Sequence, residues 1–258
     1  MGSGLDSQRA VVTAGAGGLG LVIANFLAEA GATTFVCDID QAAVAALPAG
    51  ISGSVVDVAD PDAVAAWIDP IAAEGVDILV NNAGSAGPTA SVEDVDPGEW
   101  RRCLEICLSG QFYCARRVIP SMKTRGGGAI INITSTAGLM GMPNRAPYVA
   151  AKFGVVGLTK TLAMELGRDN IRVNAIAPGS ITGERMDRVI SAHAESDGIS
   201  GEEARFLYVQ GTSMATFVSP QEVADLVLYL VGPSGRHISG QVISVDGHTE
   251  TLYPRSLD

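Results

Sequence analysis

Two side chains on one predicted helix have the spacing of a proton-transfer pair. Tyr148 and Lys152 are the ends of a five-residue Tyr-Val-Ala-Ala-Lys run, and residues four apart share one helix face. A phenol is a poor base near neutrality because its unperturbed pKa is about 10, but an adjacent ammonium group favours the ionised form. The pair predicts a general acid/base with Tyr148 as the proton carrier. For these two residues alone, an ordinary helix pair is the alternative.

A glycine-rich loop near the N-terminus predicts a dinucleotide site. A strand predicted over Ala10–Thr13 leads into the loop 14–20, Ala-Gly-Ala-Gly-Gly-Leu-Gly, and an amphipathic helix follows over Leu21–Ala30. Glycines allow the backbone to turn sharply and to approach a pyrophosphate, which then binds the free N–H groups at the helix start. A glycine-rich turn without a ligand is the alternative. The candidate cofactor contacts in the loop are Gly15, Gly17, Gly18 and Leu19.

Acidic residues after the next two predicted strands indicate which dinucleotide binds. Asp38 comes eighteen residues after Gly20, where a carboxylate can accept hydrogen bonds from the adenosine ribose hydroxyls. Its charge would repel a 2′-phosphate, and no Arg or Lys follows it. NAD is therefore favoured over NADP. Asp57 is placed to bind the adenine amino group, although Asp38 taken alone could instead cap the following helix.

The elements that must position these residues are short apolar strands separated by helical segments. This alternation is typical of parallel strands buried on both faces and crossed over by helices. The sequence thus predicts an α/β fold, a doubly wound seven-stranded Rossmann sheet in one domain over residues 1–258. The predicted strands are Ala10–Thr13, Thr33–Cys37, Ser54–Val56, Ile78–Val80, Ala129–Ile133, Val173–Ala177 and Gln241–Val245.

The long segment Ser180–Val218 contains no predicted strand and is too polar and irregular to be core. It follows the sixth strand at the carboxyl edge of the sheet, where such folds bind ligands, so we expect it to be the substrate loop. The last helix is expected to begin at Ser219, Pro220 and Glu222, which form an N-cap, first-turn proline and capping box.

Composition and charge exclude several classes of function. The formal net charge is −11, which disfavours nucleic acid and anionic membrane surfaces as partners. No apolar run reaches the ~18 residues of a spanning helix, and the N-terminus lacks the pattern of a signal peptide, so we expect a cytoplasmic protein. The four cysteines, Cys37, Cys103, Cys107 and Cys114, are expected to be reduced and buried, with no metal site.

Four further motifs carry a resemblance to a known family. They are Asn81-Asn82-Ala83-Gly84 after the fourth strand, Ser135 after the fifth, the Tyr148 to Lys152 run, and Pro178-Gly179 after the sixth. In this order, and over nearly the whole chain, the sequence resembles the compact, single-domain short-chain dehydrogenases/reductases. Ser135 upstream of Tyr148 makes the ordinary-helix interpretation of the Tyr–Lys pair weak.

The resemblance implies an NAD-dependent oxidoreductase that interconverts a secondary alcohol and its carbonyl by hydride transfer. It implies that Tyr148 is the acid/base, that Lys152 also holds the nicotinamide ribose, and that the Ser135 hydroxyl binds the substrate oxygen. Beyond the loop glycines, Leu19 and the two aspartates, the cofactor contacts that it implies are Val58, Asn82, Ala83, Gly84, Tyr148, Lys152, Pro178, Gly179 and Ile181.

The sequence departs from the family pattern at two positions. Cys107 stands where the compact enzymes usually carry Asn, in a role that is partly main-chain, because a carbonyl there holds a water of the proton relay. A cysteine keeps that carbonyl but cannot supply the amide that helps to hold a local helix distortion, so a weakened relay is expected. Ala14 replaces the first loop glycine, and we expect little effect.

Alternatives to this interpretation remain open at the sequence level. One is a cofactor-binding sensor or scaffold with an impaired site, for which Cys107 is the only support; another is an extended relative that acts on nucleotide sugars, which needs a larger C-terminal domain. The family also implies a homotetramer, paired through helices expected over Pro97–Lys123 and Pro147–Gly167.

The substrate class is only partly indicated. A polar, sugar-like or hydroxy-acid alcohol is expected, because arginines suit a carboxylate, sulfonate or phosphate. For most of the residues concerned, a solvated surface position is the alternative. They are Arg145, Glu184, Arg185, Arg188, His193 and Arg205.

Overall fold

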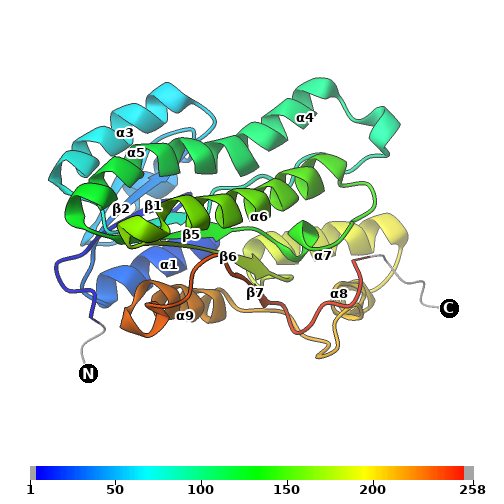
Figure 1. Ribbon diagram of the computed structural model, residues 1–258. Helices are drawn as coiled ribbons and strands as arrows, with labels where there is room; N and C mark the ends of the chain where they lie inside the picture. The colour runs from blue at the N-terminus through cyan, green and yellow to red at the C-terminus, as the bar shows by residue number, and fades with distance from the viewer. Residues whose placement is uncertain (1–3, 253–258) are drawn as a thin grey trace.

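The computed structural model describes residues 4–252, except for the side chains of Arg185, Ala192 and Ser196. Its centre is a seven-stranded sheet of order β3-β2-β1-β4-β5-β6-β7, in which every pairing is parallel. Helices cover both faces (Figure 1). The predicted doubly wound Rossmann sheet is confirmed. The strands are β1 Arg9–Thr13, β2 Thr33–Asp38, β3 Ile51–Val55, β4 Ile78–Asn81, β5 Gly128–Ile133, β6 Ile171–Pro178 and β7 Val242–Val245.

The edge strand β3 differs most from its predicted position. It begins at Ile51, where it pairs with Thr34 of β2, rather than at Ser54. The sequence Ile-Ser-Gly-Ser-Val has no continuous apolar run. Its start is therefore set by hydrogen bonding to β2, which an apolar pattern does not report.

Two helical layers bury the two faces of the sheet. On one face, α1 (Gly18–Glu29) and α9 (Pro220–Val231) enclose a core that includes Val12, Ile23 and Leu230. On the other, α3 (Pro61–Glu74), α5 (Gly110–Arg125) and α6 (Ala146–Leu166) run alongside one another, as Figure 1 shows. The short helices α2 (Gln41–Ala45) and α4 (Pro97–Leu104) complete the framework. Within the described residues, no helix has the length and apolar character needed to cross a membrane.

The expected start of the last helix is confirmed in detail. Ser219 accepts a hydrogen bond from the Glu222 N–H at 3.3 Å, and the Glu222 carboxylate accepts one from the Ser219 N–H at 2.7 Å. This capping box satisfies backbone donors that the first helical turn would otherwise leave unpaired.

The segment 180–218 is more ordered than its sequence indicates. It forms α7 (Glu184–Asp197) and α8 (Gly201–Val209), and Ile190, Ala204 and Val209 are buried. Its two ends are joined at the base, because the Thr182 N–H donates to the Val218 carbonyl at 2.8 Å. As expected, the described residues 180–218 contain no named strand. The sequence pattern did not predict the two helices, which helix caps and a few buried contacts stabilise despite the polar composition.

Candidate active site

Tyr148 and Lys152 lie beside each other on the first turns of α6. The Nζ atom of Lys152 is 5.6 Å from the centre of the Tyr148 ring. Lys152 is only 3% exposed, and its Nζ donates to the Ile133 carbonyl at 2.9 Å. A buried ammonium is costly unless it is hydrogen-bonded, so this carbonyl fixes the lysine beside the tyrosine ring.

The end of β5 brings Ser135 to the same helix. The Thr134 hydroxyl donates to the Lys152 carbonyl at 2.9 Å, and a Cβ at Gly138 would lie 2.8 Å from that carbonyl oxygen. Ser135, between these contacts, is extended at φ −171° and its Oγ accepts from the Ala137 N–H at 3.2 Å. Ser135 thus lies on a segment that packs directly against the helix of Tyr148 and Lys152.

The loop 14–20 has room for a ligand where it faces outward and none where it faces the protein. A Cβ at Gly17 or Gly18 would meet nothing within 4 Å, whereas one at Gly20 would lie 2.0 Å from the Ala14 carbonyl oxygen. The Gly15 N–H donates to the Cys37 carbonyl at 2.9 Å. This open cradle at the start of α1 fits a dinucleotide pyrophosphate.

Ala14 adopts a conformation that favours glycine. Its φ is +50°, a left-handed value that costs a residue with a Cβ about 1–2 kcal/mol. The sequence-based expectation was of little effect from alanine in place of the first loop glycine, and it did not include this backbone strain. The hydrogen bond from Asn82 to the Ala14 carbonyl helps to offset the strain.

Asp38 lies at the rim of this loop and does not cap α2. One Asp38 carboxylate oxygen accepts from the Ala16 N–H at 3.3 Å and the other from the Asp40 N–H at 3.2 Å. The cap of α2 is Asp40, whose Oδ1 accepts from Ala42 and Ala43. The alternative interpretation of Asp38 as a helix cap is therefore wrong.

One carboxylate oxygen of Asp57 forms an ion pair with Arg102. Arg102 donates to its Oδ2 at 2.6 Å, and the Ala59 N–H donates to its Oδ1 at 3.0 Å. Burial works to raise the pKa of Asp57, but these two hydrogen bonds outweigh it and the pKa is lowered. The next residue, Val58, is buried against Gly110.

Asn82 connects β4 to the glycine-rich loop. Its Nδ2 donates to the carbonyls of Thr13 and Ala14, each at 3.1 Å. The N–H groups of Asn82 and Ala83 both donate to Thr13 Oγ1. The Asn82 amide thus holds the loop in place, a positioning role that the motif alone did not indicate.

Two other predicted cofactor positions flank the centre. An added Cβ at Gly84, which is exposed, would lie 3.6 Å from Lys152 Nζ. Gly179 follows β6 and is packed against Asp246, and Ile181 forms a bridge with Val218 at the base of the segment 180–218. Pro178, the last residue of β6, is buried.

Cys107 lies within a π-helical turn, Glu105–Ser109, between α4 and α5. Its thiol accepts from the Ser85 N–H at 3.2 Å and donates to the Ser85 carbonyl at 3.3 Å. On sequence grounds, a cysteine cannot supply the amide that helps to hold a local helix distortion here. The distortion is present, and although a cysteine supplies no amide, its thiol bonds both backbone groups of Ser85.

All four cysteines are buried and free, as expected. A hydrogen bond to Cys107 and burial raise the pKa of the Cys103 thiol. Among the residues that the structure describes, no cluster of His, Cys, Asp or Glu has the arrangement of a metal site.

The polar residues expected in the substrate region divide into two groups. Arg205 pairs with Asp187 at 3.4 Å and covers the Phe217 ring, while Arg188 donates to the carbonyl of Glu184; these lie at the surface. His193 instead contacts the ring of Tyr208 of α8, a residue that sequence reasoning missed because no motif marks it. Arg145 lies beside the ring of Tyr148. The Arg185 side chain is outside the described residues.

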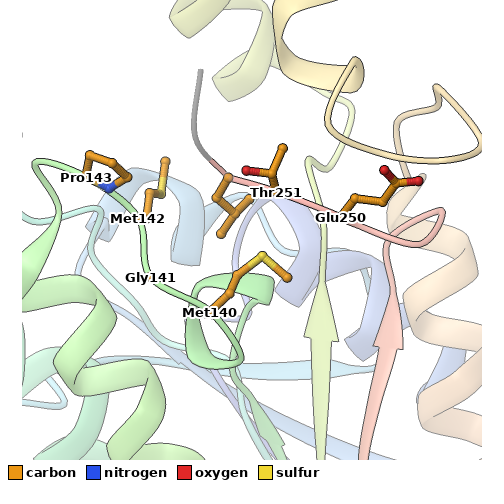
Figure 2. Close-up of a pocket in the computed structure, with 7 residues that line it drawn as sticks. Met140, Gly141, Met142, Pro143, Glu250 and Thr251 are labelled. Carbon is orange, nitrogen blue, oxygen red and sulfur yellow. The ribbon is translucent and has the colours of Figure 1, made fainter. Parts of the chain in front are cut away.

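A cavity of about 510 Å³ opens beside the loop that joins Ser135 to Tyr148. Figure 2 shows residues of the 140–143 loop on one side and Glu250 and Thr251 on the other. The Glu250 carboxylate accepts from the Ser213 hydroxyl at 2.6 Å. No sequence signal pointed to Glu250, because it reaches the cavity only through the path of the chain after β7.

Comparison with known proteins places this fold and site in one family. A family model described as Enoyl-(Acyl carrier protein) reductase matches residues 14–248. The chain is 36% identical to D-beta-hydroxybutyrate dehydrogenase of Rhizobium meliloti, over 93% of this chain and 98% of the relative. It is 35% identical to cis-4-hydroxycyclohexanecarboxylate dehydrogenase of Sinomonas cyclohexanicum, over 96% and 98%.

Solved structures agree with these relatives. A 7 alpha-hydroxysteroid dehydrogenase complexed with NADH superposes with a TM-score of 0.86 at 30% identity, covering 98% of both chains. L-sorbose reductase from Gluconobacter frateurii, complexed with NADPH, gives a TM-score of 0.91 at 28% identity, over 96% of this chain and 98% of that one. The chain therefore belongs to the short-chain dehydrogenase/reductase family, as an oxidoreductase acting on CH–OH groups.

Proposed function

We propose that this enzyme is an NAD-dependent dehydrogenase/reductase that interconverts a secondary alcohol and its carbonyl, with Tyr148 as the acid/base. The observation that carries the proposal is the buried ammonium of Lys152, hydrogen-bonded to Ile133 and 5.6 Å from the Tyr148 ring centre. A fixed positive charge at this place stabilises negative charge on the phenol oxygen.

Tyr148 and Ser135 have separate roles in the proposed reaction. In the oxidative direction, ionised Tyr148 accepts the hydroxyl proton of the substrate, and in reduction it returns a proton to the carbonyl oxygen. The Ser135 hydroxyl donates a hydrogen bond to that oxygen as charge develops on it. Bound NAD would supply the hydride acceptor. Its pyrophosphate would lie on the open face of Gly17 and Gly18.

The preference for NAD rests on Asp38. Its carboxylate is at the rim of the loop 14–20, bonded to the Ala16 N–H, where it would accept from ribose hydroxyls and repel a 2′-phosphate. Among the structural neighbours, one is complexed with NADH and another with NADPH. The fold therefore accommodates both dinucleotides, and Asp38 is the local feature that favours NAD here.

Two relatives are named for hydroxy acids, and a structural neighbour is named for a sugar. A polar secondary alcohol is therefore the substrate class that we propose. The alternative of a sensor or scaffold depended on Cys107, whose thiol bonds both backbone groups of Ser85, so the geometry of the site does not favour it.

The first prediction tests the proposed acid/base. Tyr148→Phe should lower kcat by at least about 100-fold, since general acid/base catalysis contributes 10²–10⁴-fold. NADH formation from NAD+ with a panel of secondary alcohols, including hydroxy acids and polyols, would measure it. Tyr229→Phe is the matched control. It removes a phenolic hydroxyl from the exposed side of α9 and should keep the parent rate. Equal turnover of the two variants would contradict the proposal.

A further inference from the structure

Arg145 carries a positive charge for which the described part of the chain provides no counter-ion. It immediately precedes α6, and one of its terminal nitrogens donates to the Ala86 carbonyl. None of the ion pairs within residues 4–252 includes it. Its Nε atom is buried and has no hydrogen-bond partner. An unpaired, partly buried guanidinium with unused donors is costly, which suggests a ligand that completes it.

The guanidinium lies next to the reacting group. Its central carbon is 5.3 Å from the centre of the Tyr148 ring, and Lys152 is at a similar distance from that ring. The Lys152 ammonium is fixed by its hydrogen bond to the Ile133 carbonyl. In the proposed mechanism its charge acts on the Tyr148 phenol. Arg145 is the second cation, and its planar fork of donors matches the geometry of a carboxylate.

The helices of the segment 180–218 bring two polar side chains, Tyr208 and His193, into contact with each other. Burial raises the pKa of Tyr208, and the positive charge of Arg145 opposes that shift. The ring of His193 meets Tyr208 edge-on at 5.6 Å. The buried Nδ1 atom of His193 also lacks a partner, while its Nε2 is paired with Asp197.

We propose that Arg145 is the specificity-determining residue that binds an anionic group of the substrate, a carboxylate or an oxyanion of the same shape, beside the hydroxyl that Tyr148 deprotonates. The substrate class is therefore a secondary alcohol that carries an anionic group, which deepens and rests on the proposed function.

Glu250 defines the orientation of such a substrate. It is the ionisable side chain among the residues that line the 510 Å³ cavity, and its carboxylate would repel an anion placed there. The anionic end should therefore point towards Arg145 and the uncharged end into the cavity. If Glu250 instead dominates the site, neutral ligands should bind better than anionic ones.

Calorimetry with unreactive ligand pairs tests this assignment without turnover. The probes are butyrate, cyclohexanecarboxylate and benzoate, each compared with its neutral amide, titrated into the enzyme saturated with NADH. In the parent protein, at least one acid should bind ten or more times tighter than its amide. Arg145→Met should remove that difference and leave the amide affinity within about twofold, while Arg145→Lys should keep part of it.

The matched control is Arg168→Met, which removes an exposed arginine just beyond the other end of α6, ~30 Å from Arg145 for a helix of this length. It should leave the acid preference unchanged. Acid and amide affinities that are equal in the parent for all three pairs, or that fall together in Arg145→Met, would overturn the inference, the latter because Arg145 then only positions the loop.

These outcomes are separate from those for the proposed function. Turnover of neutral alcohols without any acid preference would refute the anionic substrate and leave the dehydrogenase intact. Acid-selective binding that depends on Arg145, in a protein that forms no NADH from any alcohol, would support the anion site and contradict the proposed function.

Discussion

The thiol of Cys107 occupies a place where the sequence pattern leads one to expect an amide, and it bonds the Ser85 N–H and carbonyl at 3.2 and 3.3 Å. The π-helical turn Glu105–Ser109 around it is intact, and π-turns are frequent at functional sites. We therefore expect the side chain at this position to act on proton supply through the local backbone rather than by contact with substrate.

The second prediction follows from this geometry. Cys107→Asn should raise kcat by less than about fivefold, because the backbone distortion that the amide would support already exists. A factor of five in rate corresponds to only about 1 kcal/mol in the activation barrier. NADH affinity should change little. Steady-state kinetics and NADH titration would measure the two effects. A gain of a hundredfold would mean that the thiol severely impairs the relay.

The third prediction concerns Asp38. The parent protein should bind NAD at least tenfold tighter than NADP, and Asp38→Ala should narrow that gap because the charge that repels a 2′-phosphate is removed. Calorimetric titration with both cofactors gives the ratio. Asp40→Ala is the control: it removes the cap of α2 at a cost of about 1 kcal/mol in stability and should leave the ratio unchanged. Equal affinities in the parent would refute the assignment.

The turn between β1 and α1 shows how one element serves both fold and ligand. Gly20 allows α1 to approach Ala14 and Asn82, where a Cβ would overlap backbone and amide atoms. Gly18 has φ +50° and open space around its absent Cβ. The two glycines of one loop are therefore required for different reasons, close packing at Gly20 and close approach of a ligand at Gly18.

The fourth prediction separates these two requirements. Gly20→Ala should destabilise the protein by about 1–3 kcal/mol through overpacking, and so lower Tm by several degrees. Gly18→Ala should cost about 1–2 kcal/mol of backbone strain but weaken NADH binding by more than tenfold. Thermal unfolding with and without NADH distinguishes them. If Gly18→Ala bound NADH with parent affinity, the pyrophosphate would not lie on this turn.

Exposed apolar side chains on α5 and α6 bear on the assembly of the whole molecule. Phe112 and Phe153 are each 45% exposed and Met164 is 85% exposed, and α5 and α6 lie on the same helical layer (Figure 1). Large apolar side chains left exposed on neighbouring helices favour association with another protein surface when they form a patch. We propose that this layer pairs with a second copy of the chain.

The fifth prediction is a homotetramer. Light scattering at micromolar concentration should give a mass about four times 26.5 kDa. Phe153→Asp should shift the species towards smaller assemblies, because a charge at an apolar interface is costly to desolvate. Tyr229→Asp, on the exposed side of α9, is the control and should not alter the mass. A parent protein of 26.5 kDa in solution would refute the proposal.

The sequence by itself determined the features that depend on nearby residues. Apolar runs located the seven strands, with β3 displaced; the Ser219 capping box was visible as a motif; and the spacing of Tyr148 and Lys152 placed both on one helix face. Such patterns report contacts within a turn or a strand, because secondary structure repeats over two to four residues.

Only the tertiary structure decided which distant groups meet. Asn82 bonds Thr13 across 69 residues of chain, Asp40 rather than Asp38 caps α2, and Glu250 reaches the cavity beside the 140–143 loop. Arg145 was a candidate from its sequence position, but the lack of a counter-ion for it within residues 4–252 became visible only in the folded structure. Hydrogen bonding and charge compensation are set by the side chains that surround a group in space, and local sequence patterns do not encode those neighbours.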